Sequence, residues 1–304
     1  MGNMIHLRFF VFGTALLIVL CLLLKTLASS GSQAQRTSAA HIPRKIWQKW
    51  ETPVQGLGEE LMRLSKSWID MNPDHRYELL TGDSSLTYVR ERYEQYPDII
   101  EVFEQTTDGI LRADLIRYLT LLSDGGVYTD IDTDCSRPIG EWIPKDLAEQ
   151  TGLLLGIEYD SQGGEIRKDF NIPTQLCQWT LMARPGHPVL QHVVDRVVEK
   201  LLADVRVKDN VTSHDLLYVL ETTGPRMFTR AVLESLSLQL HRRISYEDVS
   251  NLTEPTMFGD VLVLPISSFA SGQDHSGSKP WGNDEQLMSH HFLGFQGWKA
   301  SHAS

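Results

Sequence analysis

Three aspartates within five residues, Asp130, Asp132 and Asp134, are the side chains whose type and spacing most clearly suit chemistry. They follow a short β-prone run at 127–129, and alternate residues of an extended strand share one face. If the chain turns here, two of the carboxylates can converge on one hard cation. Mg²⁺ and Mn²⁺ prefer oxygen ligands, commonly one or two carboxylates together with substrate phosphates. A solvated acidic turn is the alternative, because short motifs often match by chance.

A helix predicted over Ile110 to Ser123 must position these aspartates. Its apolar residues recur at spacings of three and four, which is the period of a helix, and two glycines follow at 125–126 to end it. The segment is apolar apart from Arg112, Asp114 and Arg117, and polar groups on a buried helix need partners. This context favours a functional site over a solvated turn.

Strands and helices alternate along the rest of the chain, with no internal repeat and no G-x-G-x-x-G fingerprint. The alternation predicts an α/β sandwich around a mostly parallel central sheet flanked by helices. A polar segment at 159–169 is predicted as a mobile loop. The predicted strands are 42–50, 76–80, 127–129, 152–157 and 261–266, and the predicted helices are 57–71, 84–93, 97–105, 110–123, 189–202 and one beginning at Pro225.

The formal net charge of the 304-residue chain is −11. Nucleic-acid binding depends on basic patches that neutralise phosphates, so the composition argues against a nucleic-acid partner. The hydrophobic fraction of 41% is sufficient for one sizeable domain with extensions.

The N-terminal segment predicts entry into the secretory pathway. The apolar run from Phe9 to Leu24, extended by Leu27 and Ala28, approaches the roughly 17–25 residues of a spanning helix. We expect a cytoplasmic tail (1–8), an uncleaved signal-anchor (9–28), a luminal stem (29–41) and a luminal domain (42–304). A cleaved signal peptide, which would give a secreted protein, is the alternative.

Two glycosylation sequons, at Asn210 and Asn251, corroborate a luminal domain. Apart from Cys21 in the apolar run, the sequence has Cys135 and Cys177. In an oxidising lumen these two could pair and brace the aspartate segment, or both could be buried free thiols.

Three stretches carry a family resemblance. R-A-D-L-I-R-Y at 112–118 and G-G-V-Y-T-D-I-D at 125–132 resemble the donor-site core of glycosyltransferases with a D-x-D motif. N-I-P-T-Q-L-C-Q-W-T-L-M-A-R-P-G-H-P at 171–188 is most similar to the fungal initiation-specific α-1,6-mannosyltransferase family (glycosyltransferase family 32). The resemblance covers nearly all of the predicted luminal domain and implies a GT-A-type glycosyltransferase fold.

The resemblance also implies roles for individual residues. It assigns the D-x-D pair to Asp130 and Asp132, and it assigns the metal, Mn²⁺ or Mg²⁺, to this pair and a C-terminal histidine. The ending G-F-Q-G-W is longer than the family pattern and lacks its serine, which leaves His290 and His291 as alternatives, with His291 favoured. The implied catalytic residues are Asp130, Asp132 and Arg117, and the implied substrate-binding residues are Trp47, Arg112, Asp114, Arg117 and Trp298. A core position for Trp47 is the alternative.

The resemblance implies a transferase that moves mannose from GDP-mannose to an N-linked high-mannose glycan, with retention and in α-1,6 linkage. It also implies a type II protein of the Golgi membrane. Such a protein can join a complex with other mannosyltransferases. One alternative is transfer to a sphingolipid or another glycan. No long apolar run follows 261–266, which argues against the sphingolipid branch because its members usually carry further spans there. A second alternative function is that of a non-catalytic subunit in a mannosyltransferase complex.

Overall fold

The computed structural model describes residues 41–52, 54–207, 215–274 and 277–294. The predicted tail and anchor lie outside these ranges, as do residues 29–40 of the predicted stem, Asn210 and Trp298. Within them, every helix is too short or too polar to cross a bilayer.

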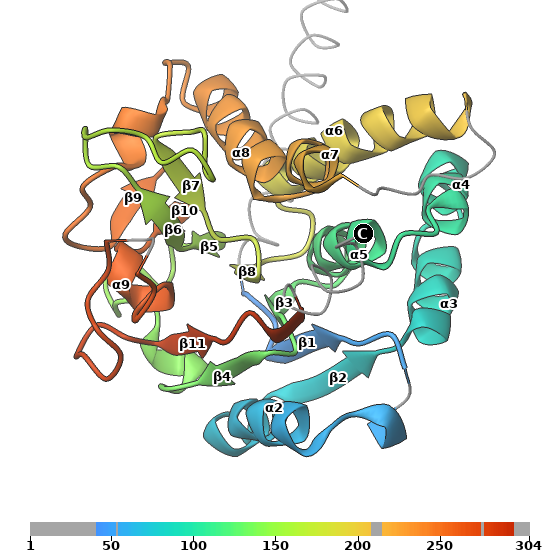
Figure 1. Ribbon diagram of the computed structural model, residues 1–304, viewed down its shortest axis with the longest axis horizontal. Helices are drawn as coiled ribbons and strands as arrows, with labels where there is room; N and C mark the ends of the chain where they lie inside the picture. Colours follow the sequence, from blue (N-terminus) through green and yellow to red (C-terminus); the bar gives the residue numbers. More distant parts are fainter. Residues whose placement is uncertain (1–40, 53, 208–214, 275–276, 295–304) are drawn as a thin grey trace, which may run out of the picture. The chain divides into compact units, whose positions relative to one another are not determined.

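A seven-stranded mixed sheet forms the centre of the fold (Figure 1). Five of its strands run in one direction, while β8 and β9 run in the other. This confirms the predicted α/β class and the mostly parallel sheet. In spatial order the strands are β2 (Arg76–Leu80), β1 (Lys45–Lys49), β3 (Gly126–Thr129), β8 (Thr180–Ala183), β5 (Leu153–Leu155), β10 (Val261–Val263) and β9 (Thr256–Phe258).

Both faces of the sheet are buried. Trp47 and Tyr128 pack into one hydrophobic cluster, while their neighbours Ile46 and Val127 pack into another on the opposite face, as the strand period of two requires. The first cluster is completed by α3 (Gly82–Arg92), α4 (Pro97–Gln105), α5 (Gly109–Ser123), α6 (Pro188–Val205), α7 (Leu216–Thr222) and α8 (Pro225–Gln239). The second is completed by α2 (Glu59–Met71), α9 (Ile266–Phe269) and a two-stranded sheet of β4 (Thr133–Cys135) and β11 (Met288–His290). The short 3₁₀ helices are η1 (Val54–Gly56), η2 (Ile139–Glu141) and η3 (Tyr246–Val249).

Most predicted elements form near their expected bounds, and β2 has the predicted ones. The predicted strand at 152–157 is instead divided at Gly156 into β5 and β6 (Ile157–Asp160). A Cβ at Gly156 would lie 2.4 Å from Cδ2 of Phe269, so α9 packs directly on the backbone there. Beyond this point β6 leaves the central sheet and pairs with β7 (Thr174–Leu176).

The two cysteines of the described chain are buried free thiols, so the alternative of a disulfide is not realised. Asn72 Nδ2 lies 3.5 Å from Cys135 Sγ, and the thiol donates to the carbonyl oxygen of Arg137 at 3.1 Å. Burial raises the pKa of Cys135 to about 11. Packing and hydrogen bonds, rather than a covalent link, therefore brace the segment after the aspartates.

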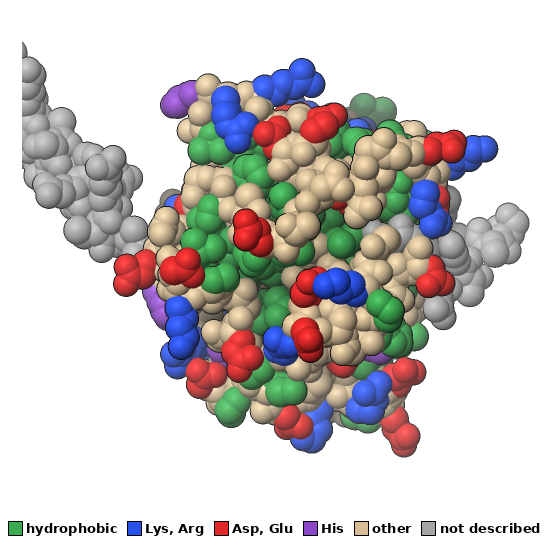
Figure 2. All heavy atoms as spheres, turned by 90° about the vertical axis from the view of Figure 1, so that its left-hand side faces the viewer, with side chains coloured by type: hydrophobic (Ala, Val, Ile, Leu, Met, Phe, Trp, Pro, Cys, Tyr) green, Lys and Arg blue, Asp and Glu red, His purple; other side chains and the backbone are tan. Residues whose placement is uncertain are grey.

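Figure 2 shows the charged side chains on one face of the molecule. On the face shown in Figure 2, acidic and basic side chains alternate around a patch of hydrophobic ones.

Gly126 provides a test of the connection between α5 and β3. Its φ is +101°, and a Cβ there would lie 2.5 Å from the carbonyl oxygen of Lys45. We expect Gly126→Ala to lower the free energy of unfolding by about 1–3 kcal/mol or more, because strain and a backbone clash add. Urea denaturation measures the change. Gly140→Ala is the matched control, because a Cβ at Gly140 meets nothing within 4 Å; equal losses in both variants would contradict the account.

Candidate active site

The aspartate motif lies on a tight turn at the carboxyl end of β3. Thr133 closes the turn, because its backbone N–H and its hydroxyl both donate to the carbonyl oxygen of Asp130, at 3.2 and 2.6 Å. Gln48 donates to the same oxygen at 3.1 Å. The three aspartates therefore do not share one face of a straight strand. The turn realises the other possibility considered for the sequence, in which two of them converge.

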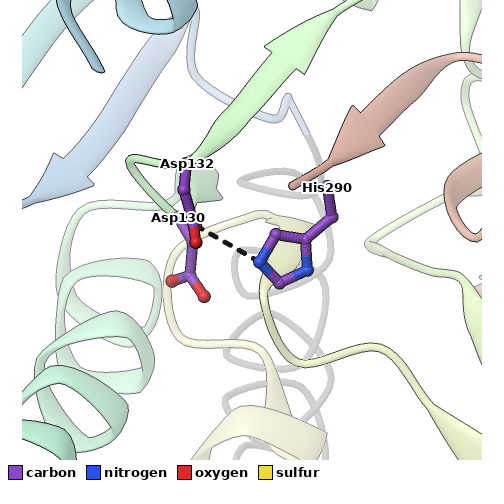
Figure 3. Close-up of side chains that lie close together, drawn as sticks. All are labelled: Asp130, Asp132 and His290. Carbon is purple, nitrogen blue, oxygen red and sulfur yellow. Dashed lines mark ion pairs between the residues drawn. The ribbon is translucent and has the colours of Figure 1, made fainter. Parts of the chain in front are cut away.

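Asp130, Asp132 and His290 form the cluster that the turn creates (Figure 3). One ligand atom from each residue lies within 4.8 Å of the others. The imidazole Nε2 of His290 is 3.2 Å from Oδ1 of Asp132. The antiparallel pairing of β11 with β4 brings the histidine here, because it places His290 opposite Thr133.

The structure differs from the sequence prediction in which histidine joins the pair. His291 was favoured, but its Nε2 lies 2.8 Å from Oδ1 of Asp134, while its backbone N–H donates to the carbonyl oxygen of Asp132. Adjacent side chains at the end of a strand point to opposite faces, so only one of the two histidines can reach the cluster. His290 is that residue, and its Nδ1 has no hydrogen-bond partner among the described residues.

The cluster fits a divalent cation. Two carboxylates and one imidazole form a donor set that suits Mn²⁺, and Mg²⁺ through the oxygens. Burial acts to raise the pKa of Asp132, but the His290 imidazole and the Gly294 N–H, at 3.0 Å from Oδ2, outweigh it and lower the pKa to about 2. Asp132 is therefore ionised at neutral pH, as a metal ligand must be.

Arg117 joins the cluster to helix α5. Its Nη2 is 2.9 Å from Oδ1 of Asp130, and its Nη1 is 2.9 Å from Oδ1 of Asp114. Burial acts to lower the pKa of Arg117, but these two carboxylates raise it well above its ordinary value. The guanidinium therefore stays charged and fixes the orientation of Asp130.

Asp114 is held more tightly than a surface carboxylate. Gln178 Nε2 donates to its Oδ1 at 3.1 Å and the Thr223 hydroxyl donates to its Oδ2 at 2.7 Å. Burial raises its pKa to about 6, although Arg117 acts to lower it. Sequence reasoning missed Gln178 and Thr223, which come from segments far along the chain; the only signal was that Gln178 falls in the stretch at 171–188.

Two other predicted substrate-binding residues lie away from the cluster. Trp47 is 1% exposed and donates its indole N–H to the carbonyl oxygen of Gly125 at 2.9 Å. Such a ring has no free surface for a nucleotide base, so the core alternative holds. Arg112 places its guanidinium 4.9 Å from the ring centroid of Phe103, and its contact with substrate stays a prediction.

Trp50, which sequence reasoning missed, is better placed than Trp47 to contact a nucleotide base. It follows β1 directly, at the edge of the sheet where ligands bind in open α/β folds. Its side chain is half-buried, and its indole N–H has no hydrogen-bond partner among the described residues. The signal was its place as the last residue of the predicted strand 42–50, since a residue in mid-strand such as Trp47 packs into the core.

Mn²⁺ binding distinguishes the two histidines. We expect His290→Ala and Asp132→Asn each to weaken Mn²⁺ binding at least tenfold, because each removes one ligand. His291→Ala and Asp134→Asn are matched controls that should bind Mn²⁺ as the unaltered chain does. Electron paramagnetic resonance titration of free Mn²⁺ measures all four. Loss of binding in the controls, with retention in the first pair, would assign the ion to the other side of β11.

Helix α5 carries one buried arginine, Arg117, and one half-buried arginine, Arg112, so their variants compare the cost of losing each charge. Arg117→Met leaves Asp114 and Asp130 without their cation, so we expect a loss of about 3–5 kcal/mol of unfolding free energy. Arg112→Met removes one cation–π contact and should cost about 1 kcal/mol or less. Chemical denaturation of both variants gives the comparison, and similar small losses would show that the bridge is not needed for stability.

Comparison with known proteins shows what the chain resembles. Residues 58–149 match the model of the glycosyltransferase sugar-binding region containing the DXD motif. The chain is 34% identical over 266 residues to an initiation-specific alpha-1,6-mannosyltransferase of Schizosaccharomyces pombe, covering 86% of this chain and 64% of the relative. It is 28% identical over 279 residues to the Candida albicans protein of the same name, covering 84% and 72%.

A second kind of relative matches a shorter region. The inositol phosphoceramide mannosyltransferase 3 of Schizosaccharomyces pombe is 34% identical over 101 residues, which is 33% of this chain and 27% of the relative. The longer matches include the elements that carry Asp130, Arg117 and the segments supporting them. Over most of its length the chain is therefore similar to initiation-specific alpha-1,6-mannosyltransferases, and within it residues 58–149 match the sugar-binding region of D-x-D glycosyltransferases.

Proposed function

We propose that this protein transfers mannose from GDP-mannose to an N-linked high-mannose glycan, forming an α-1,6 linkage with retention of the anomeric configuration. The observation that carries the proposal is the convergence of the D-x-D pair with His290 and Arg117, in a chain similar to these mannosyltransferases. The donor and the acceptor follow from the names of the relatives and from the resemblance of the sequence motifs.

The charge of the site suits a diphosphate leaving group. Asp130, Asp132 and His290 would hold the divalent cation, proposed as Mn²⁺, which supplies positive charge where the diphosphate gains negative charge. Arg117 keeps Asp130 in its ligand orientation through the 2.9 Å ion pair. Asp114, fixed by three donors, would accept hydrogen bonds from hydroxyls of the ribose or sugar.

The proposed step is a front-face displacement. The bond between the anomeric carbon and the diphosphate oxygen breaks, and the bond from that carbon to the acceptor oxygen forms on the same face of the sugar. The acceptor's hydroxyl proton passes to the leaving phosphate oxygen, so the step needs no protein nucleophile. Protein groups act by orienting the donor and excluding water.

We place the protein in the Golgi membrane as a single-pass type II protein, anchored through residues 9–28, with a complex with other mannosyltransferases as a further proposal. A cleaved signal peptide and a secreted protein are the alternative. The sphingolipid acceptor has weaker support, because the ceramide-directed relative matches one third of the chain rather than most of it.

Donor transfer by the full chain tests the proposed function. GDP-mannose, UDP-glucose and UDP-galactose are offered in turn with Mn²⁺ and a trimmed high-mannose glycan. We expect mannose transfer only, abolished by a chelator and reduced at least a hundredfold in Asp130→Asn/Asp132→Asn, because the diphosphate charge is then uncompensated. Mass spectrometry and linkage analysis of the product give the readout.

Each other outcome identifies a different error. Transfer from a UDP-sugar would support the proposed active site but contradict GDP-mannose as the donor. Transfer to inositol phosphoceramide instead of the glycan would overturn the acceptor. A folded chain that binds no nucleotide would favour the non-catalytic subunit.

A further inference from the structure

Glu158 is a buried carboxylate at the same edge of the central sheet as the D-x-D turn. Strand β5 lies two places from β3 in the sheet and runs parallel to it, so the carboxyl ends of both strands meet this edge. Glu158 follows β5 by way of Gly156. It is the residue at which the pairing of β6 with β7 shifts register, between Ile157 and Tyr159. Such bulges commonly re-aim a side chain beside an active site.

Half of the Glu158 carboxylate lacks a partner. Its Oε2 accepts a hydrogen bond from Gln175 Nε2 at 2.9 Å, while Oε1 accepts none from the described residues. The residue is 8% exposed. Burial raises the pKa of Glu158, while Gln175 and Trp179 act to lower it as hydrogen-bond donors and His290 and Arg117 act to lower it through their charge. Unlike Trp179 Nε1, this oxygen is not fully enclosed, so a ligand can reach it and donate to it.

Trp179 presents a buried donor on the same side. Its backbone carbonyl accepts a hydrogen bond from the Asp130 N–H at 2.9 Å, and its ring centroid lies 4.7 Å from that of His290. It is 4% exposed, yet its indole Nε1 has no hydrogen-bond partner among the described residues. An unmet buried donor costs about 1–3 kcal/mol. The Trp179 indole acts on the Glu158 carboxylate as a donor, which places the two groups side by side near the candidate metal ligands, although no hydrogen bond of ordinary geometry joins them.

The chemistry of this pair selects one kind of ligand group. A hydroxyl both donates and accepts, so one hydroxyl can donate to Glu158 Oε1 and accept from Trp179 Nε1. A phosphate oxygen can only accept, and its charge would be repelled by Glu158. The donor substrate of the proposed function has several hydroxyls on its sugar ring, attached directly to the diphosphate.

We propose that Glu158 and Trp179 form a hydroxyl-binding pair for the transferred sugar of the nucleotide-sugar donor, separate from the groups that hold the diphosphate. The proposal rests on the proposed function, since it assigns the sugar part of the same site. Glu158 and Trp179 thereby contribute to the choice of sugar, and the D-x-D cluster does not.

Paired binding measurements isolate the contribution of the sugar. Calorimetry of the full chain with Mn²⁺ gives Kd for GDP and for GDP-mannose in the absence of acceptor. We expect Glu158→Gln to leave Kd for GDP within twofold and to weaken GDP-mannose binding roughly ten- to hundredfold, the range for a hydrogen bond to a charged group. Trp179→Phe keeps the ring and loses the N–H, so a smaller, roughly two- to tenfold, sugar-selective loss is expected. Glu101→Gln, on the exposed side of α4, is the control.

A double variant and a set of donor analogues test whether both groups bind one hydroxyl. Glu158→Gln/Trp179→Phe should cost less than the sum of the single losses, because the two groups share a partner. With the unaltered chain, one of the GDP-mannose analogues that each lack a single hydroxyl should bind as weakly as GDP-mannose binds to the double variant. If the double variant fails to fold, the same analogue should bind Glu158→Gln no more weakly than it binds the unaltered chain, because the hydroxyl that Glu158 would hold is already absent.

Three results would overturn the inference in different ways. Equal losses for GDP and GDP-mannose would make Glu158 a structural residue. Unchanged GDP-mannose binding in folded variants would place the sugar elsewhere, while leaving the proposed function intact. An unaltered chain that binds neither GDP nor GDP-mannose would refute the proposed function and this inference together.

Discussion

The buried ion bridge from Asp114 through Arg117 to Asp130 is the interaction on which the rest of the site depends. A guanidinium with two carboxylates at 2.9 Å joins the middle of α5 to the end of β3, two elements that are adjacent in sequence and must be held at a fixed angle. Buried charges of this kind are tolerated only when paired and hydrogen-bonded. Gln178 and Thr223 complete the pairing, so segments before β8 and α8 are tied to the same point.

The sheet explains why the remaining groups meet there. Asp130 follows β3, Trp179 precedes the antiparallel β8, and Glu158 follows β5, and these three strands are neighbours. Their ends at this edge therefore bring together residues that are distant in sequence. The small β4–β11 sheet adds His290 from near the end of the described chain. One edge thus carries the candidate metal ligands, and beside them a donor and an acceptor suited to a hydroxyl.

The sequence was sufficient to predict those elements whose formation depends on residues near one another in the chain. The spacing of leucines predicted α5, and the glycines at 125–126 ended it because they accept positive φ. The polar residues of an otherwise apolar helix correctly indicated buried partners. What the sequence could not give were long-range pairings: the register of β11 on β4 decides between His290 and His291, and periodicity contains no information on it. Glu158 was missed because its orientation arises from a bulge and from a strand division caused by packing of Phe269 on Gly156.

A crystal structure of the full chain with Mn²⁺ and GDP, recorded with anomalous scattering from manganese, tests the central claim most directly. The account predicts one manganese peak bounded by Asp130, Asp132 and His290, with the diphosphate completing its coordination and Arg117 still bridging Asp114 and Asp130. A manganese peak between Asp134 and His291, or a diphosphate bound at another edge of the sheet, would contradict it.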